Sequence, residues 1–247
     1  MIRRFLLIIT AAVVISGCTA TPQPKFEFAA GTRIGVINYL EPYATHQNFS
    51  SLRIGSFSKK LTVNWQMPAY FEDKLTRILR SDPRYTVIPI RPAEASGGIN
   101  QQLDRIGEIS MSDKIKPEVA DFLKTLADKH NLDIIIVIKS FRGPSAVKID
   151  KHPIELKGYG LFTKVFLISK QAHAYANITA VVFKTEPLNY IGSGKPINKK
   201  SPLKDFDLAG NLKNLPQSEI DKLEPIIQKY ADQAIANALD DANLIFY

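Results

Sequence analysis

Four histidines are the residues best suited to act as acids, bases or metal ligands in this sequence: His46, His130, His152 and His173. A zinc site of the HExxH type needs two histidines four residues apart on one helix face, and no two of these have that spacing. A GxSxG turn, which carries the nucleophile of α/β-hydrolases, is also absent from the sequence. We therefore expect a protein that is not an enzyme, with no metal and no cofactor, and histidines that are at the surface or half-buried.

A glycine-rich stretch, Gly192-Ser193-Gly194-Lys195-Pro196, has some likeness to the end of a nucleotide-binding P-loop. A P-loop needs its first glycine where this chain has Asn189, and it needs a Ser or Thr to hold magnesium where this chain has Pro196. The stretch also lacks a predicted strand before it and a predicted helix after it. The sequence therefore predicts a flexible loop here and no nucleotide site.

The basic segment around that stretch is the strongest local candidate for a binding site. Residues 186–216 are rich in Gly, Pro, Asn and Lys, which predicts a long loop. Loops longer than about 12–15 residues are usually functional or disordered. The candidate contacts for a partner or an anion are Tyr190, Lys195, Lys199, Lys200 and Lys204. Two interpretations stay open: a docking loop in which Tyr190 and Ile191 are apolar anchors among charges, or a solvated connector.

The single cysteine, Cys18, has a sequence context that points to a specific modification. Arg3 and Arg4 precede an apolar run over residues 5–15, which is interrupted only by Thr10 and is too short to span a bilayer. A basic start followed by a short apolar run is typical of a secretory signal peptide. The alternatives at this point are an ordinary secreted protein with an incidental cysteine, or a lipoprotein.

The residues before Cys18 favour the lipoprotein. Ile15-Ser16-Gly17-Cys18 resembles a bacterial lipobox, which implies a diacylglycerol on the thiol, cleavage just before Cys18 and acylation of the new amine. Stable anchoring needs more than one acyl chain. The residue after Cys18 is Thr19 and not Asp. In enterobacterial lipoproteins, the absence of Asp at this position resembles the pattern of proteins sent to the outer membrane and not retained in the inner membrane. We expect the periplasmic face of the outer membrane, with the inner membrane as the alternative.

Lipidation of Cys18 divides the chain into three parts. Residues 1–17 are the signal peptide, 18–31 are the lipidated cysteine and a flexible tether, and 32–247 are one periplasmic domain. The whole chain has 32 Lys+Arg against 24 Asp+Glu, and removal of Arg3 and Arg4 leaves 30 against 24, a net charge of +6. This basic excess favours anionic neighbours, and an envelope location argues against nucleic acid.

The periodicity of apolar residues predicts alternating strands and helices in that domain. Helices are expected over 67–79, 99–106, 117–130 and 218–241. In the last of these, Pro225 either kinks the helix or marks its true first turn. Strands are expected over 32–40, 84–90 and 133–141, and an extended segment or hairpin arm around 61–63. The run 134–138 is apolar on both faces, so its strand should be central. Residues 159–169 and 173–185 should form an antiparallel hairpin that turns at 170–172.

These elements predict an α/β (α+β) domain with a mixed sheet, helices packed on it, a hairpin near the C-terminus and a closing helix. Residues 244–247 should pack back on the domain. The strand "RIGVINYL", the strand "YTVIPI", the helix and strand "LADKHNLDIIIVIKSF" and the closing helix together resemble small envelope lipoproteins with an anticodon-binding-like α/β domain. That group includes curli-secretion lipoproteins, activators of penicillin-binding proteins and the N-terminal domain of the Tol–Pal periplasmic component.

The resemblance implies a function by binding. Members of this group bind proteins or assemble into rings and are not enzymes, so we expect a membrane-anchored, non-catalytic interaction or assembly module of the cell envelope. Its partner would be an envelope protein or a second copy of the chain. The alternatives are a binder of anionic envelope ligands and, with less support, a hydrolase of wall or glycan components.

Overall fold

The computed structural model describes residues 27–50, 55–91, 115, 117–149, 152–166, 169–194, 199–208 and 210–245. The expected signal peptide, Cys18, the first part of the tether, Lys195 and the expected helix over 99–106 lie outside these residues. The strands are β1 (Thr32–Tyr39), β2 (Ala44–Ser50), β3 (Phe57–Leu61), β4 (Tyr85–Ile90), β5 (Ile134–Ser140), β6 (Arg142–Ile149), β7 (His152–Phe166), β8 (Ser169–Thr185), β9 (Leu188–Ser193) and β10 (Lys199–Pro202). The helices are α2 (Met67–Arg80), α4 (Pro117–His130), α5 (Gln217–Asp221) and α6 (Glu224–Asp241).

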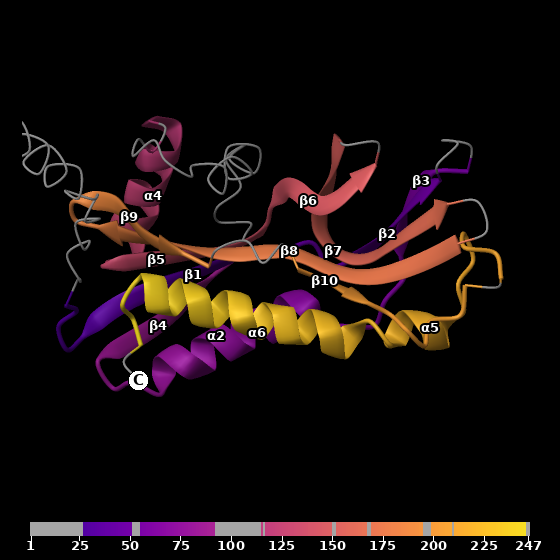
Figure 1. Cartoon of the computed structure of the whole chain (residues 1–247). Coiled ribbons are helices and arrows are strands. Elements are labelled where there is room, and N and C mark those ends of the chain that lie inside the picture. The colour runs from indigo at the N-terminus through magenta and orange to yellow at the C-terminus, as the bar shows by residue number, and fades with distance from the viewer. Residues whose placement is uncertain are drawn as a thin grey trace, which may run out of the picture.

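All ten strands belong to one mixed sheet, in which β8 joins two halves (Figure 1). The first half of β8 pairs with β7 and β10, and β2 and β3 continue the sheet beyond β7. The second half of β8 pairs with β5 and β9, and β1 and β4 continue the sheet beyond β5 in parallel register. The result is an elongated sheet whose two ends are far apart along β8.

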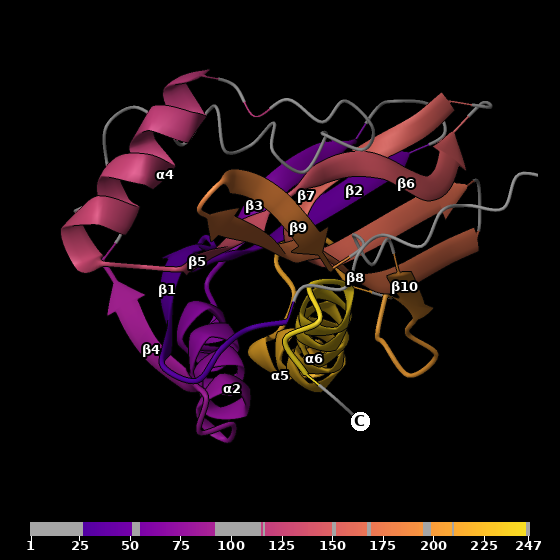
Figure 2. The same cartoon turned by 90° about the vertical axis from the view of Figure 1, so that its left-hand side faces the viewer.

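Helices cover both faces of the sheet (Figure 2). The apolar sides of α2 and α6 share one core with the strand residues Ile34, Ile136 and Ile138. On the opposite face, α4 packs over Ile135 and Val137. All seven residues of β5 are buried, which confirms the prediction of a central strand. The mixed α/β architecture with a closing helix is likewise confirmed.

Glycines let α6 lie directly against β9. A Cβ atom added to Gly194 would be 2.3 Å from the backbone oxygen of Ala234, and one added to Gly192 would be 2.8 Å from the amide nitrogen of Ala242. No ordinary side chain fits at those distances. Gly192 and Gly194, which in sequence have some likeness to a P-loop, thus permit close packing between helix and sheet. Gly192 is part of strand β9.

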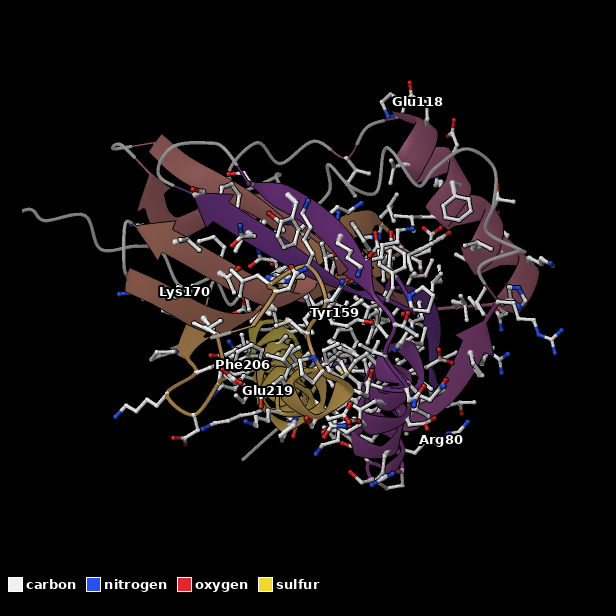
Figure 3. All side chains as sticks on the ribbon, turned by 90° about the vertical axis from the view of Figure 1, so that its right-hand side faces the viewer. Arg80, Glu118, Tyr159, Lys170, Phe206 and Glu219 are labelled. Atoms are coloured by element: carbon white, nitrogen blue, oxygen red, sulfur yellow. The ribbon has the colours of Figure 1, made fainter. Side chains whose placement is uncertain are left out.

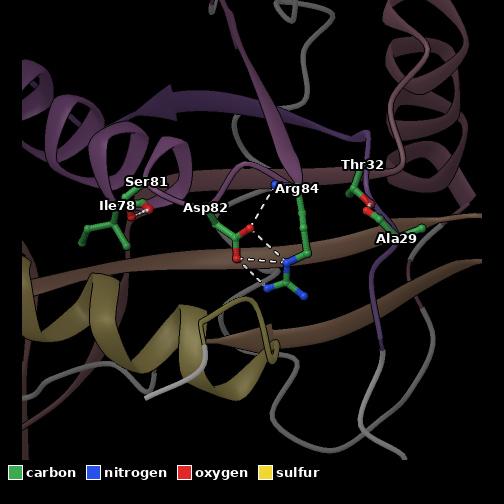
Figure 4. Close-up of polar contacts among 6 residues, drawn as sticks. All are labelled: Ala29, Thr32, Ile78, Ser81, Asp82 and Arg84. Carbon is green, nitrogen blue, oxygen red and sulfur yellow. Dashed lines mark hydrogen bonds and ion pairs between the residues drawn. The ribbon is translucent and has the colours of Figure 1, made fainter.

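Polar contacts fix the end of the domain where β1 begins (Figure 4). Asp82 accepts hydrogen bonds from the backbone and the guanidinium of Arg84 in the turn between α2 and β4. These bonds lower the pKa of the Asp82 carboxyl. The Thr32 hydroxyl donates to the carbonyl oxygen of Ala29 at 2.7 Å, and Phe28 packs against the core. The chain therefore enters the domain beside the α2–β4 turn.

The structure corrects several predicted elements. The expected loop over 186–216 contains two strands, β9 and β10, because edge strands rich in Gly, Lys and Pro have the composition of a loop. The hairpin of β7 and β8 is confirmed, but both strands are longer than predicted and residues 170–172 are paired within β8. The helix expected over 218–241 is two helices, and Pro225 lies in the first turn of α6, which is one of the two roles expected for it. Two strands with few apolar residues, β2 and β6, were not predicted.

Candidate interaction surface

One end of the sheet holds β3, the end of β7, the start of β8, β10 and α5 (right in Figure 1), and its segments are rich in lysine. We call this region, residues 57–61, 163–166, 169–171, 199–208 and 210–222, the lysine-rich end. It contains four acidic residues: Asp205, Asp207, Glu219 and Asp221. It contains nine lysines: Lys59, Lys60, Lys164, Lys170, Lys199, Lys200, Lys204, Lys213 and Lys222. Its net charge of +5 accounts for nearly all of the net charge of +6 expected for the mature chain.

A strap crosses this end, formed by residues 203–216 between β10 and α5. Lysines from three different elements donate hydrogen bonds to its backbone. The ammonium of Lys222 reaches the carbonyl oxygen of Asp205 at 2.7 Å, and that of Lys170 reaches Leu208 at 2.7 Å. The ammonium of Lys59, on β3, reaches the carbonyl oxygen of Lys213 at 2.8 Å. The strap is therefore attached to α5, β8 and β3 at successive points along its length.

The strap also contributes to the core and to a buried carboxylate contact. Its apolar side chains pack on the main core: Leu203, Phe206, Leu208 and Leu215. Glu219 of α5 accepts a hydrogen bond from the backbone N–H of Asp207 at 3.0 Å and one from the ammonium of Lys222 at 2.7 Å. These two donors lower the pKa of the Glu219 carboxyl. Figure 3 views the molecule from this end, with Phe206 and Glu219 close together and Lys170 on the neighbouring strand.

Two open hollows flank the start of the strap. One has a volume of about 450 Å³ and lies toward β8, where Lys170 and Lys204 meet the side chains of Leu203, Phe206 and Leu208. The other has a volume of about 430 Å³ and lies toward the helices. It is lined by Lys204, Lys222 and one acidic residue, Asp205, together with Leu203, Phe206 and Ile226. Lys204 is exposed and borders both hollows. Each hollow combines apolar side chains with lysine ammonium groups.

A row of buried polar side chains lies at the same end, on β2 and β7. The Thr163 hydroxyl donates to Asn48 Oδ1 at 2.7 Å, and Asn48 Nδ2 donates to the carbonyl oxygen of Gly55 at 2.9 Å. Because the hydroxyl proton is used, Thr163 must accept from His46, whose Nε2 is 2.8 Å away. His46 therefore carries a proton on Nε2, and its buried Nδ1 has no hydrogen-bond partner. Burial, reinforced by Lys59, lowers the pKa of His46 to about 4.

The structure separates the residues that the sequence grouped into one site. Lys199 and Lys200 lie on β10, opposite Ala176 and Tyr175 of β8, and Lys204 lies on the strap just beyond. Tyr190 lies on β9 opposite Phe183. Since Phe183 and Tyr175 are eight residues apart on β8, Tyr190 is about 26 Å along the strand from Lys200. Tyr190 therefore lies apart from Lys199, Lys200 and Lys204, Ile191 is buried in the core, and Lys195 lies outside the described residues.

Sequence reasoning missed the other members of the lysine-rich end. Lys59, Lys170, Lys213 and Lys222 come from segments separated by up to about 160 residues, and nothing in their local sequence distinguishes them from ordinary surface lysines. Only the pairing of β3, β2, β7, β8 and β10 in one sheet brings them together.

A second polar cluster joins the ends of β1 and β5 to the middle of β7. The Ser140 hydroxyl donates to a carboxylate oxygen of Glu41, and the Lys157 ammonium is 3.2 Å from the other. The Tyr159 hydroxyl donates to the backbone oxygen of Glu41 at 2.8 Å, and burial raises its pKa. Ser140 and Tyr159 are about 1% exposed, so the hydroxyls are closed to a substrate. We assign this cluster to holding β1, β5 and β7 together.

Among the described residues, no group of three or more His, Cys, Asp or Glu side chains is arranged to hold a metal ion. Within that same part of the chain, no helix has the length and apolar character needed to cross a bilayer.

Comparisons with known proteins include a weak likeness to a solved structure. No protein-family model matches the sequence, and no curated protein matches it. Among solved structures, the chain is similar to a crystal structure of a Xanthomonas campestris protein described by the family model DUF330. That likeness has 8% sequence identity and a TM-score of 0.34, and it covers 90% of this chain and 94% of that one. A likeness of this size carries no argument about fold or activity.

Proposed function

We propose that this protein is a lipid-anchored bacterial envelope protein that works as a non-catalytic binding module, with the lysine-rich end as its binding surface. The sequence Ile15-Ser16-Gly17-Cys18 supports the anchor, on the periplasmic face of the outer membrane. The single observation that carries the binding role is the position of the charge. The nine lysines of the lysine-rich end belong to β3, β10, α5 and adjoining segments, and these elements lie opposite the end of the domain where β1 begins (Figure 1).

This geometry presents the binding surface away from the anchor. From Cys18 to Glu27 the tether extends at most about 30 Å, and it joins the domain beside the α2–β4 turn. The elongated sheet then places β3, β10 and α5 farther out. A surface of one charge sign attracts partners of the opposite sign and speeds their association, so an acidic protein of the envelope is the partner that fits.

Self-assembly through the same surface is disfavoured. Two copies that met at their lysine-rich ends would bring together two regions of net charge +5. Like charges held face to face destabilise a contact, so a second copy would have to use another surface.

Photocrosslinking in intact cells tests the proposal. A photoreactive amino acid replaces Lys204 on the strap or, as the control, Glu118 at the exposed start of α4. We expect an envelope protein to crosslink at position 204 and not at 118. In a parallel pair, Lys204→Glu should lower recovery of that protein, whereas Lys124→Glu on α4, with the same change in charge, should not. Equal crosslinking at both positions, or equal recovery with both variants, would contradict a binding role for the lysine-rich end.

A further inference from the structure

The hollows beside the strap narrow the chemistry of the partner, given the function proposed above. We propose that the strap binds an acidic peptide segment with an apolar side chain. The carboxylates would contact Lys170, Lys204 and Lys222, and the apolar side chain would enter one of the two hollows beside Leu203 and Phe206.

The lysines retain hydrogen-bond donors for such a ligand. An ammonium group has three N–H donors. Lys170 uses one on Leu208, and Lys222 uses two, on Asp205 and Glu219. Lys204 has no hydrogen bond to any described residue and is exposed. Six donors therefore remain around the start of the strap, enough for more than one carboxylate.

The hollows explain why the ligand should also be apolar. Each has side chains of Leu203 and Phe206 between two lysines, so an ion that entered alone would lie partly against hydrocarbon. A leucine or phenylalanine side chain flanked by carboxylates would bury apolar surface in the hollow while its charges meet the lysines at the rim. A simple inorganic anion or a bare acidic glycan matches only the rim.

Strand addition to the free edge of β10 is a poorer mode of binding. The N–H of Leu203 bonds to Ala172 of β8, and alternation along the strand then directs the N–H and C=O of Lys200 outward. The next outward position is Pro202, which has no N–H to donate. A partner strand would find few backbone groups there, so we expect recognition by side chains.

A direct binding measurement separates these modes. The probe is a fluorescein-labelled hexapeptide Glu-Glu-Leu-Phe-Glu-Glu, and the control peptide has two serines in place of Leu-Phe. The protein is the full lipidated chain in mild nonionic detergent. Fluorescence anisotropy should show binding of the first peptide and at least tenfold weaker binding of the second, because burying one large apolar side chain is worth about that factor or more.

Single-residue variants test whether the peptide binds at the strap. Lys204→Gln should weaken binding of the Leu-Phe peptide about two- to fivefold, the range for one exposed ion pair. Lys124→Gln on α4 removes the same charge far from the strap and should leave the affinity unchanged. Vesicles of phosphatidylcholine with and without phosphatidylglycerol test a membrane as the ligand.

Three results would overturn the inference: equal affinity for both peptides, an unchanged affinity in Lys204→Gln, or binding to anionic vesicles without binding to the peptide. Crosslinking to an envelope protein at position 204 would stand in any of these cases, so failure of this inference is distinct from failure of the proposed function.

Discussion

His46 shows how one residue makes this end of the domain sensitive to acid. Its Nε2 donates to Thr163, and its Nδ1 lies buried without a partner, so a second proton on the ring would gain no hydrogen bond. The charged neighbour that acts on it is Lys59, directly opposite on β3, which repels a protonated imidazole. Burial and this repulsion together keep the ring neutral in the folded protein.

We predict that the free energy of unfolding falls as the pH is lowered from about 6.5 toward 4. The folded-state pKa of His46 is about 4, whereas that of an unfolded histidine is about 6.5, so the unfolded state binds more protons in this window. The full stability is present above about pH 6.5, and roughly 3 kcal/mol at most is lost by pH 4. Urea unfolding at several pH values measures this slope.

The variant His46→Gln isolates the contribution of His46 to the pH dependence of the free energy of unfolding. Glutamine can donate to Thr163 from its amide but does not titrate, so this variant should have a smaller pH slope between 4 and 6.5. A His46→Gln variant whose slope equals that of wild type would assign the acid sensitivity to other groups.

At the scale of elements, the packing of α6 on the sheet depends on missing side chains. Ala234 and Ala242 of the closing helical segment approach the backbone at Gly194 and Gly192, next to β8 and its edge strand β9. A helix that lies this close buries its apolar face against Ile138 and Val182 in the same core. The contact is therefore as much a property of the two backbones as of the core side chains.

Gly194→Ala should destabilise the protein by about 2–3 kcal/mol. The added methyl group would lie 2.3 Å from the backbone oxygen of Ala234, so the helix must shift. The expected loss of stability is at the upper end of the range for overpacked cores. Gly210→Ala, on the strap, is the matched control, because nothing lies within 4 Å of its added Cβ. That control should be neutral or slightly stabilising. Thermal and urea unfolding compare the two, and equal stabilities would show that α6 does not restrict this position.

At the scale of the whole molecule, charge is segregated along the long axis. The lysine-rich end has nine lysines and four acidic residues, which leaves 21 basic and 20 acidic residues in the rest of the expected mature chain. The rest of the mature chain is therefore nearly neutral as a whole, and the net positive charge belongs to the lysine-rich end. Such a distribution orients an approaching acidic partner toward the strap.

We predict that acylated Cys18 attaches the protein to the outer membrane. Mass spectrometry of the mature protein should find an N-terminal peptide that begins at acylated Cys18. Cys18→Ser should move the protein from the outer-membrane fraction to a soluble periplasmic or precursor form, because the remaining residues supply no acyl chain. An unmodified Cys18, or cleavage at another position, would contradict the anchor while leaving the fold of residues 27–245 unaffected.

The sequence by itself determined the elements whose pattern is local. The helical periodicity predicted α4 over its observed residues and α2 to within one residue, and the run of Ile and Val predicted the central strand β5. Each of these elements buries one face or both faces in a core, so its apolar spacing records its environment. The neutral, buried state of His46 was not predicted, because it depends on Thr163 and Lys59 from distant strands.

Tertiary structure decided the edges and the surface. β9 and β10 resemble loops in sequence because Gly, Lys and Pro, which protect an edge or admit a helix, are also the residues of loops. Strand pairing placed Tyr190 far from Lys204 and brought Lys59, Lys170 and Lys222 to the strap. Long-range pairing of this kind leaves no periodicity in the chain, since the contact is made by residues that the sequence keeps apart.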